Sequence, residues 1–226
     1  MIMAGMDLCL LACCLLLSGA RLVKTEISKT TAGSTMTSEG AERRRIALTF
    51  DDGPHPVYTE ELLDGLKERG VKATFFVTGE HARQYPDLIR RMQEEGHLIG
   101  NHTYSHVQLR RDHQEEFIRE LQMTNEVITS ITGEEVLYVR PPYGSWDRCL
   151  EKGLNMFPVL WTIDPTDWSC LNADTVTCRV EKKAKDNAII LLHDSYQSSV
   201  DAALRIVDEL SKEGYEFVTV DEVLTE

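Results

Sequence analysis

The chain has 226 residues, of which 42% are hydrophobic and 27% are charged, so its composition is that of a globular protein with a core of ordinary size. Its formal net charge is −13 at pH 7. Because nucleic-acid binding requires a basic surface, this charge argues against a nucleic-acid partner.

The N-terminal segment has features of a targeting sequence. Residues 8–20 are almost all apolar and end in Ser-Gly-Ala, which suits the core and the cleavage site of a signal peptide. The run is shorter than the ~20 residues of a membrane span. The nearest positive charges, Arg21 and Lys24, follow the run, whereas a signal peptide carries them in front of it.

We predict a signal peptide or membrane anchor over residues 1–24 and a flexible linker, rich in Ser, Thr, Gly and Glu, over residues 25–44. A protein of this kind would be extracellular or held at the cell surface by its N-terminal tether, and we expect a monomer. Three cysteines, an odd number, lie after the apolar run, which excludes a dense disulfide framework. Cys170 and Cys178 could form a bridge, but free thiols are the expected state.

From Ile46 onward, strand-like and helix-like segments alternate along the chain. The strand-like segments are short, apolar and mostly without polar alternation, as expected for strands that are buried on both faces. Predicted strands are Ile46–Phe50, Ala73–Val77, His97–Asn101, Leu137–Arg140, Phe157–Thr162, Ala188–Leu192 and Phe217–Val220.

Helical periodicity fills the segments between these strands, and most of the predicted helices are followed by a glycine. One predicted helix begins at Pro86 and one covers about residues 172–185. Strand–helix alternation predicts a largely parallel sheet. About seven such units favour an α/β distorted (β/α) barrel, with an open doubly wound sheet as the alternative. Apolar residues that mark the helices are Leu62, Leu63, Leu66, Leu88, Ile89, Met92, Phe117, Leu121, Ile128, Ile131, Val176, Val180, Val200, Ala203, Leu204, Val207 and Leu210.

Polar residues of unusual kinds follow several of these strands. In parallel α/β proteins, functional side chains gather at the C-terminal ends of the strands. We therefore expect a site built from these ends, and the remaining histidines, His55, His81, His97 and His113, are expected to be surface or structural residues. The polar residues at the strand ends are Asp51, Asp52, Asn101, His102, Arg140, Asp164, Asp167, His193 and Asp194.

His102 and His106 are the first candidates for metal ligands. Their i, i+4 spacing would place both imidazoles on one side if the segment were helical. Metalloprotease helices add a glutamate after the first histidine, but Thr103 stands there in this chain. With Asp52 as a third ligand, the set would suit zinc, cobalt or nickel.

Five segments, in this order, closely resemble the motifs of the polysaccharide deacetylases, the carbohydrate esterase family 4 domain with NodB homology. The resemblance extends from about Arg45 to Leu224, so we assign residues 45–226 to this domain. Five motifs in order at strand ends are a specific signal. They are Thr-Phe-Asp-Asp-Gly-Pro at 49–54, His-Thr-Tyr-Ser-His at 102–106, Arg-Pro-Pro-Tyr-Gly at 140–144, Asp-Pro-Thr-Asp-Trp at 164–168 and Leu-Leu-His-Asp at 191–194.

This resemblance implies a distorted barrel and a divalent metal, usually zinc, bound by Asp52, His102 and His106. It makes Asp51 the general base that takes a proton from the attacking water. Arg140 would orient Asp51 and keep it ionised.

The remaining roles concern the substrate. The resemblance implies that the backbone N–H of Tyr143 stabilises the oxyanion together with the metal. His193 would protonate the leaving amine, with Asp167 favouring its charged form. Trp168 and Leu191 would form a small apolar pocket for the acetyl methyl group.

Three functions stay open from the sequence. The first is N-deacetylation of N-acetylglucosamine units in a polysaccharide, with peptidoglycan or chitin-type oligomers as substrates. The second keeps the fold but changes the reaction, to O-acetyl xylan esterase or hydrolysis of another C–N bond. The third is an inactive glycan-binding protein, which the complete set of motif residues disfavours.

Overall fold

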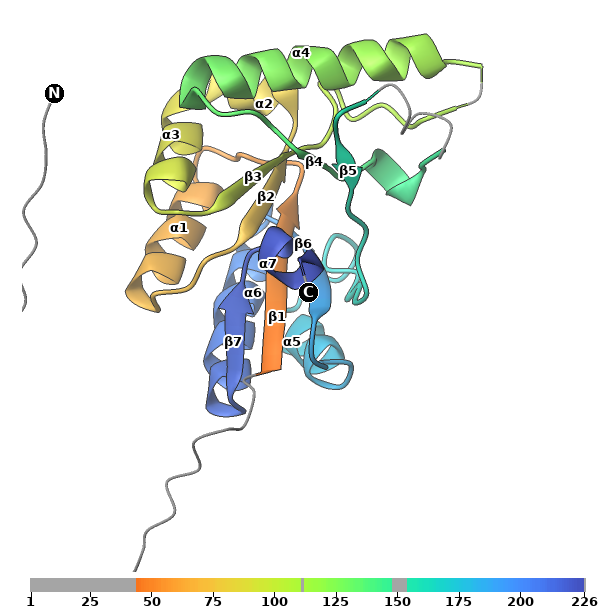
Figure 1. Ribbon diagram of the computed structural model, residues 1–226. Coiled ribbons are helices and arrows are strands. Elements are labelled where there is room, and N and C mark those ends of the chain that lie inside the picture. The colour runs from red at the N-terminus through yellow and green to blue at the C-terminus, as the bar shows by residue number, and fades with distance from the viewer. Residues whose placement is uncertain (1–43, 111, 148–153, 226) are drawn as a thin grey trace, which may run out of the picture. The chain divides into compact units, whose positions relative to one another are not determined.

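The computed structural model describes residues 44–110, 112–147 and 154–225, in which strands and helices alternate (Figure 1). The predicted leader, residues 1–24, and all of the predicted linker except Arg44 lie outside the described residues. Within those ranges, no helix is both long and apolar enough to cross a membrane. In chain order the elements are β1 (Arg44–Asp51), α1 (Tyr58–Glu68), β2 (Thr74–Val77), α2 (Gly79–Gln84), α3 (Pro86–Glu94), β3 (Leu98–Asn101), α4 (Gln114–Thr132), β4 (Tyr138–Val139), the 3₁₀ turn η1 (Pro142–Gly144), β5 (Phe157–Pro158), α5 (Ala173–Glu181), β6 (Ala188–His193), α6 (Gln197–Lys212), β7 (Tyr215–Val218) and α7 (Val220–Leu224).

All seven predicted strands are present and form one parallel sheet with the order β5-β4-β3-β2-β1-β6. β7 pairs with the N-terminal half of β1, and β2 pairs with its C-terminal half. Beyond β5, Ile163 bridges to Ile190 of β6 and brings the chain back to the other end of the sheet. The fold is therefore the predicted distorted α/β barrel and not an open doubly wound sheet.

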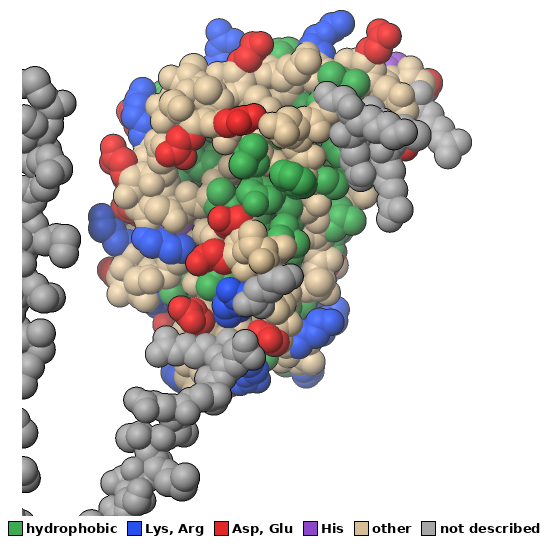
Figure 2. All heavy atoms as spheres, in the orientation of Figure 1, with side chains coloured by type: hydrophobic (Ala, Val, Ile, Leu, Met, Phe, Trp, Pro, Cys, Tyr) green, Lys and Arg blue, Asp and Glu red, His purple; other side chains and the backbone are tan. Residues whose placement is uncertain are grey.

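β5 is shorter than the predicted strand Phe157–Thr162. Val159 still donates a backbone hydrogen bond to Val139 at 2.8 Å, but Thr162 donates to Ile189 of β6 at 2.9 Å. This segment thus leaves β4 after Val159 and reaches β6 at Thr162, so its pairing with β4 ends before the predicted end of the strand. Figure 2 shows apolar side chains gathered on the face that carries β4 and β5 in Figure 1. Phe157 of β5 and Leu137, which precedes β4, are both exposed.

The two-residue period of the strands separates an outer face from an inner one. Ile46, Leu48 and Phe50 of β1 belong to the large core that includes the helices, whereas Ala47 belongs to a smaller cluster inside the barrel. Asp51 lies on the same face as Ala47, and its backbone is in register with His193 of β6. The strand pattern thus places two of the predicted site residues side by side.

Three short elements were not predicted: α2, η1 and α7. In α2 only Gly79 and Ala82 are buried, so no apolar stripe marks it in the sequence. Helix α7 starts after a capping box made by Thr219 and Glu222, a pattern that the sequence does contain. Val220 was predicted to end a strand but is the first residue of this helix.

His97 directly precedes β3 and is buried. Its Nδ1 accepts a hydrogen bond from the backbone N–H of Ala73 at 3.1 Å, and Phe75 meets its ring edge to face. Burial, assisted by the positive charge of Lys72, lowers the pKa of His97 from 6.5 to about 4. The expectation of a structural histidine is met at this position.

We expect this neutral imidazole to make the fold sensitive to acid. Between pH 6.5 and about 4, the unfolded chain binds a proton at His97 that the folded protein does not bind. The free energy of unfolding is therefore unaffected by His97 above pH 6.5, and proton binding at His97 in the unfolded chain lowers it by up to ~3 kcal/mol as the pH drops to 4. His97→Asn keeps an acceptor for the Ala73 amide but does not titrate, so its free energy of unfolding should fall less steeply. Urea unfolding of both metal-free proteins across this pH range measures the slopes, and equal slopes would contradict the expectation.

Candidate active site

Two adjacent carboxylates stand at the end of β1. In a continuing strand, successive side chains point to opposite faces. Asp52, however, has a φ of 74°, in the left-handed region, and this change of direction lets Asp51 and Asp52 line the same cleft. Gly53 follows because a Cβ atom there would lie 2.4 Å from Oδ2 of the buried Asp194.

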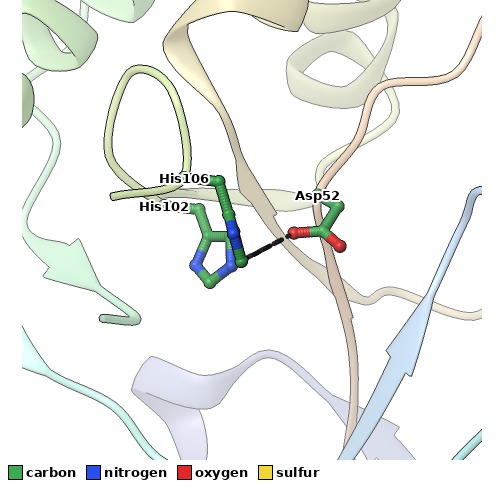
Figure 3. A group of neighbouring side chains, drawn as sticks. All are labelled: Asp52, His102 and His106. Atoms are coloured by element: carbon green, nitrogen blue, oxygen red, sulfur yellow. Dashed lines mark ion pairs between the residues drawn. The ribbon is translucent and has the colours of Figure 1, made fainter. Parts of the chain in front are cut away.

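The carboxylate of Asp52 and the imidazoles of His102 and His106 converge (Figure 3). Oδ1 of Asp52 lies 3.3 Å from Nε2 of His102 and 3.3 Å from Nε2 of His106. The three ligand atoms lie within 4.8 Å of one another. Two ligands bound at ~2.1 Å to a tetrahedral ion are ~3.4 Å apart, so this spacing fits one divalent cation.

Hydrogen bonding around these side chains also fits a cation. Nδ1 of His102 lies 2.6 Å from the carbonyl oxygen of Arg140, which can only accept, so Nδ1 carries a proton and the lone pair of the neutral tautomer is on Nε2. Oδ1 of Asp52 is buried and has no hydrogen-bond partner among the described residues. Two acceptors thus face each other, an arrangement that a shared metal ion would satisfy.

The protonation states point the same way. Burial raises the pKa of Asp52, but the close approach and charge of His102, together with the charges of His193 and His106, outweigh it and bring the pKa to about 2. Burial lowers the pKa of His106, although Asp52 opposes this shift. An ionised carboxylate beside a neutral imidazole is the state that a metal ion requires of its ligands.

The segment from His102 to His106 is not helical, so its i, i+4 spacing does not bring the two imidazoles together in the way that a helix would. Thr103 and His106 have φ values of 64° and 60°, and the segment forms an irregular loop after β3. Oδ1 of Asn101 accepts the Thr103 amide at 2.7 Å, and the Thr103 hydroxyl accepts the Val107 amide at 3.1 Å. These local bonds shape a loop in which the two ring centroids lie 5.0 Å apart.

Arg140 is fully buried and binds the carboxylate of Asp51. Its Nη1 donates to Oδ1 of Asp51 at 2.8 Å and to the hydroxyl of Thr49 at 2.6 Å. Nε donates to the carbonyl of Val159 at 3.1 Å, and the guanidinium lies over the ring of Phe76. A guanidinium fixed on this many sides fixes the orientation of Asp51 as well.

Asp167 holds His193 by two hydrogen bonds. Its Oδ1 accepts from Nδ1 of His193 at 2.9 Å, and its Oδ2 accepts from the His193 amide at 2.8 Å and from the hydroxyl of Ser199 at 2.7 Å. Nε2 of His193 then lies 4.0 Å from Oδ2 of Asp52. Burial lowers the pKa of His193, but the hydrogen bond and charge of Asp167, with Asp51 and Asp52, outweigh it and raise the pKa to about 9.

An open cleft of about 450 Å³ joins these groups, and Trp168 and Leu191 are among the residues that line it. Tyr143 lies at the rim of the cleft, where it is 68% exposed and has a φ of 59°. The centroid of its ring lies 4.9 Å from that of the His106 ring. Within the described residues the Tyr143 amide has no hydrogen-bond acceptor, so it is available to a ligand. The cleft is lined by Asp51, Asp52, His102, His106, Tyr143, Trp161, Asp164, Trp168, Leu191 and His193.

Trp161 is the cleft residue that the sequence did not single out. It lies in the predicted strand Phe157–Thr162, three residues before Asp164, and its ring lies close to Gly144, the last residue of η1. The sequence did offer one signal for Trp161, since it is an aromatic residue that lies shortly before the motif at residues 164–168. Away from the cleft, Cys170 and Cys178 are both free thiols, as expected.

Comparison with known proteins gives consistent matches. The polysaccharide deacetylase family model matches residues 38–159, more than half of the chain. The chain is 42% identical over 178 residues to peptidoglycan-N-acetylmuramic acid deacetylase PdaC of Bacillus subtilis (strain 168), which covers 79% of this chain and 38% of PdaC. It is 44% identical over 160 residues to a chitooligosaccharide deacetylase of Rhizobium leguminosarum bv. trifolii, which covers 69% of this chain and 74% of the relative.

Solved structures agree with these matches. The structure of PdaC superposes with a TM-score of 0.78 at 41% identity, over 80% of this chain and 90% of the solved one. A family 4 acetyl xylan esterase from Clostridium thermocellum, in complex with a cobalt ion, superposes with a TM-score of 0.75 at 34% identity. The match covers 80% of this chain and 91% of the esterase chain. These matches agree with the motifs and with the fold. The chain belongs to the polysaccharide deacetylase family.

Proposed function

We propose that this protein is a metal-dependent hydrolase that removes N-acetyl groups from N-acetylglucosamine units of a polysaccharide, either peptidoglycan or a chitin-type oligomer. The observation that carries the proposal is the group Asp52, His102 and His106, which shares one open cleft with Asp51 and His193. The names of the relatives support an acetylated glycan as the substrate.

The metal that we propose is zinc, with cobalt or nickel as alternatives. One carboxylate oxygen and two imidazole nitrogens from Asp52, His102 and His106 are a donor set that zinc accepts, with positions left for water and substrate. When bound, such an ion polarises a carbonyl group and lowers the pKa of water.

Protons would be moved by the protein's own side chains. Asp51, fixed by Arg140, takes a proton from the water that attacks the acetamide carbon. The Tyr143 amide donates to the oxygen on which negative charge develops. His193 then gives a proton to the nitrogen as the C–N bond breaks, and Asp167 stabilises the charged imidazole before this step. The products are acetate and a free amino sugar.

The walls of the cleft suit a small acyl group on a large substrate. Leu191 is nearly buried and Trp168 is 57% exposed, so together they offer an apolar surface for a methyl group beside the metal ligands. Because the cleft is open, a polymer could lie across it. We further propose that the protein is a monomer, placed outside the cell or tethered at the cell surface by its N-terminal segment, residues 1–24.

Acetate release tests the proposed function directly. Metal-loaded protein is incubated in parallel with peptidoglycan, chitin oligomers and acetylxylan, with and without a chelator. We expect acetate from an N-acetylated substrate and its loss on chelation. Faster release from acetylxylan would show an O-acetyl esterase instead, and glycan binding without any acetate would show an inactive binding protein.

A further inference from the structure

The short helix α2 contacts both loops that carry the metal ligands. The backbone N–H of Gly79 donates to the carbonyl of Thr103 at 3.0 Å, and that of Thr78, the N-cap of the helix, donates to the carbonyl of Gly53 at 3.1 Å. Amides of a first helical turn have no partner within the helix, and here they bind the two loops. The Thr103 loop also packs closely on α2, because a Cβ atom at Gly79 would lie 2.4 Å from the ring of Tyr104.

His81 adds a side-chain bond from α2 to a metal ligand. Its Nδ1 lies 2.7 Å from the backbone carbonyl oxygen of Asp52. Because a carbonyl can only accept, Nδ1 carries a proton and donates it. The backbone N–H of His81 in turn donates to the hydroxyl of Thr78 at 3.4 Å, so the helix cap helps to place the ring.

This bond acts at one of the unfavourable points of the site's backbone. Asp52 has a φ of 74°, and the left-handed region costs a residue other than glycine on the order of 1–3 kcal/mol. Such a conformation persists only where surrounding contacts hold it. Oδ1 of Asp52 must also stay 3.3 Å from both imidazoles, so a rotation of its backbone would separate the three ligand atoms.

We propose that His81 is a positioning residue that holds the metal ligand Asp52 in its left-handed conformation through the Asp52 carbonyl. The inference rests on the metal centre of the proposed function, but it does not depend on which substrate is hydrolysed. His81 would contribute to metal affinity although it touches neither the metal nor the substrate.

Titration of metal-free protein with Co²⁺, followed by the visible absorption of the bound ion, tests this role. His81→Leu removes the donor. His81→Asn introduces a side chain with as many non-hydrogen atoms as leucine but keeps an N–H near the place of Nδ1. Gln84→Leu, an equally apolar change at an exposed position of the same helix, is the matched control. We expect His81→Leu to weaken Co²⁺ binding by about 10–100-fold, His81→Asn to recover most of the loss, and Gln84→Leu to bind like the parent.

Other results would overturn the inference in distinguishable ways. Equal Co²⁺ affinity in His81→Leu and the parent would show that the bond to Asp52 is not needed. An asparagine variant as weak as the leucine variant would show that ring packing, and not the hydrogen bond, is responsible. If the parent protein binds no Co²⁺, the proposed metal centre itself is rejected. Circular dichroism of each metal-free variant confirms folding, and His81→Ala supplies the same comparison should the leucine variant not fold.

Discussion

Asp51→Asn should keep the metal and lose turnover by about 10²–10⁴-fold, the usual contribution of a general base, whereas Asp52→Ala should lose the metal. The two residues are neighbours with different contacts. Asp51 is 3% exposed and its Oδ1 is bound by Arg140, while Oδ1 of Asp52 faces His102 and His106. Titration with Zn²⁺ and acetate release, measured on both variants, separate the two roles.

Asp51→Asn should also destabilise the protein, and this effect must be kept apart from the chemistry. The substitution leaves the guanidinium of Arg140 charged and fully buried without its counter-ion, which costs about 3–5 kcal/mol. Activity is therefore compared below the lowered melting temperature, with the folded fraction taken from circular dichroism. Asp208→Asn provides the control, since Asp208 pairs with Arg69 at a more exposed position and its loss should cost about 0–1 kcal/mol without an effect on turnover.

A specific outcome would reject the assignment of the base. If Asp51→Asn, fully folded and metal-loaded, keeps turnover within tenfold of the parent, another group accepts the proton. If Asp52→Ala binds Zn²⁺ as tightly as the parent, the group Asp52, His102 and His106 is not the metal centre.

Much of the fold and of the site follows from short-range patterns in the sequence. Buried strands leave apolar runs, and the parallel order brings their C-terminal ends to one side. A two-residue period then puts Asp51, Leu191 and His193 on one face, with Asp51 and His193 in register. For these residues, strand identity was sufficient to predict that they lie together.

What the sequence did not predict depends on contacts between distant segments. The loop from His102 to His106 takes left-handed conformations at two residues, and its histidine spacing resembled that of a helix. Helix α2 has no apolar stripe, and the contact of His81 with Asp52 appears only when β1 and α2 are packed together. Trp161 enters the cleft because its segment crosses from β4 to β6, which no local pattern specifies.

The second large effect is expected at Asp167, which acts through His193. In Asp167→Asn, the side-chain oxygen can still accept from the amide of His193 and the hydroxyl of Ser199. The new NH₂ group would then face Nδ1 of His193, which favours a neutral ring with its proton on Nε2. Since a neutral imidazole is a poor acid, we expect kcat to fall by about 10²–10⁴-fold.

The pH dependence of the rate distinguishes this role from a purely structural one. A general acid works only while protonated, so activity is lost as the pH rises through the pKa of His193, which Asp167 helps to raise to about 9. Without that negative charge the alkaline limb should move down by about 1–3 pH units. A bound cation lowers this pKa in parent and variant alike, so their difference reports Asp167. Ser199→Ala, which removes one hydrogen bond to Asp167 but leaves its charge, should cost about 1 kcal/mol of stability and keep the limb in place. An unshifted limb in Asp167→Asn would mean that Asp167 fixes the loop and does not set the acidity of His193.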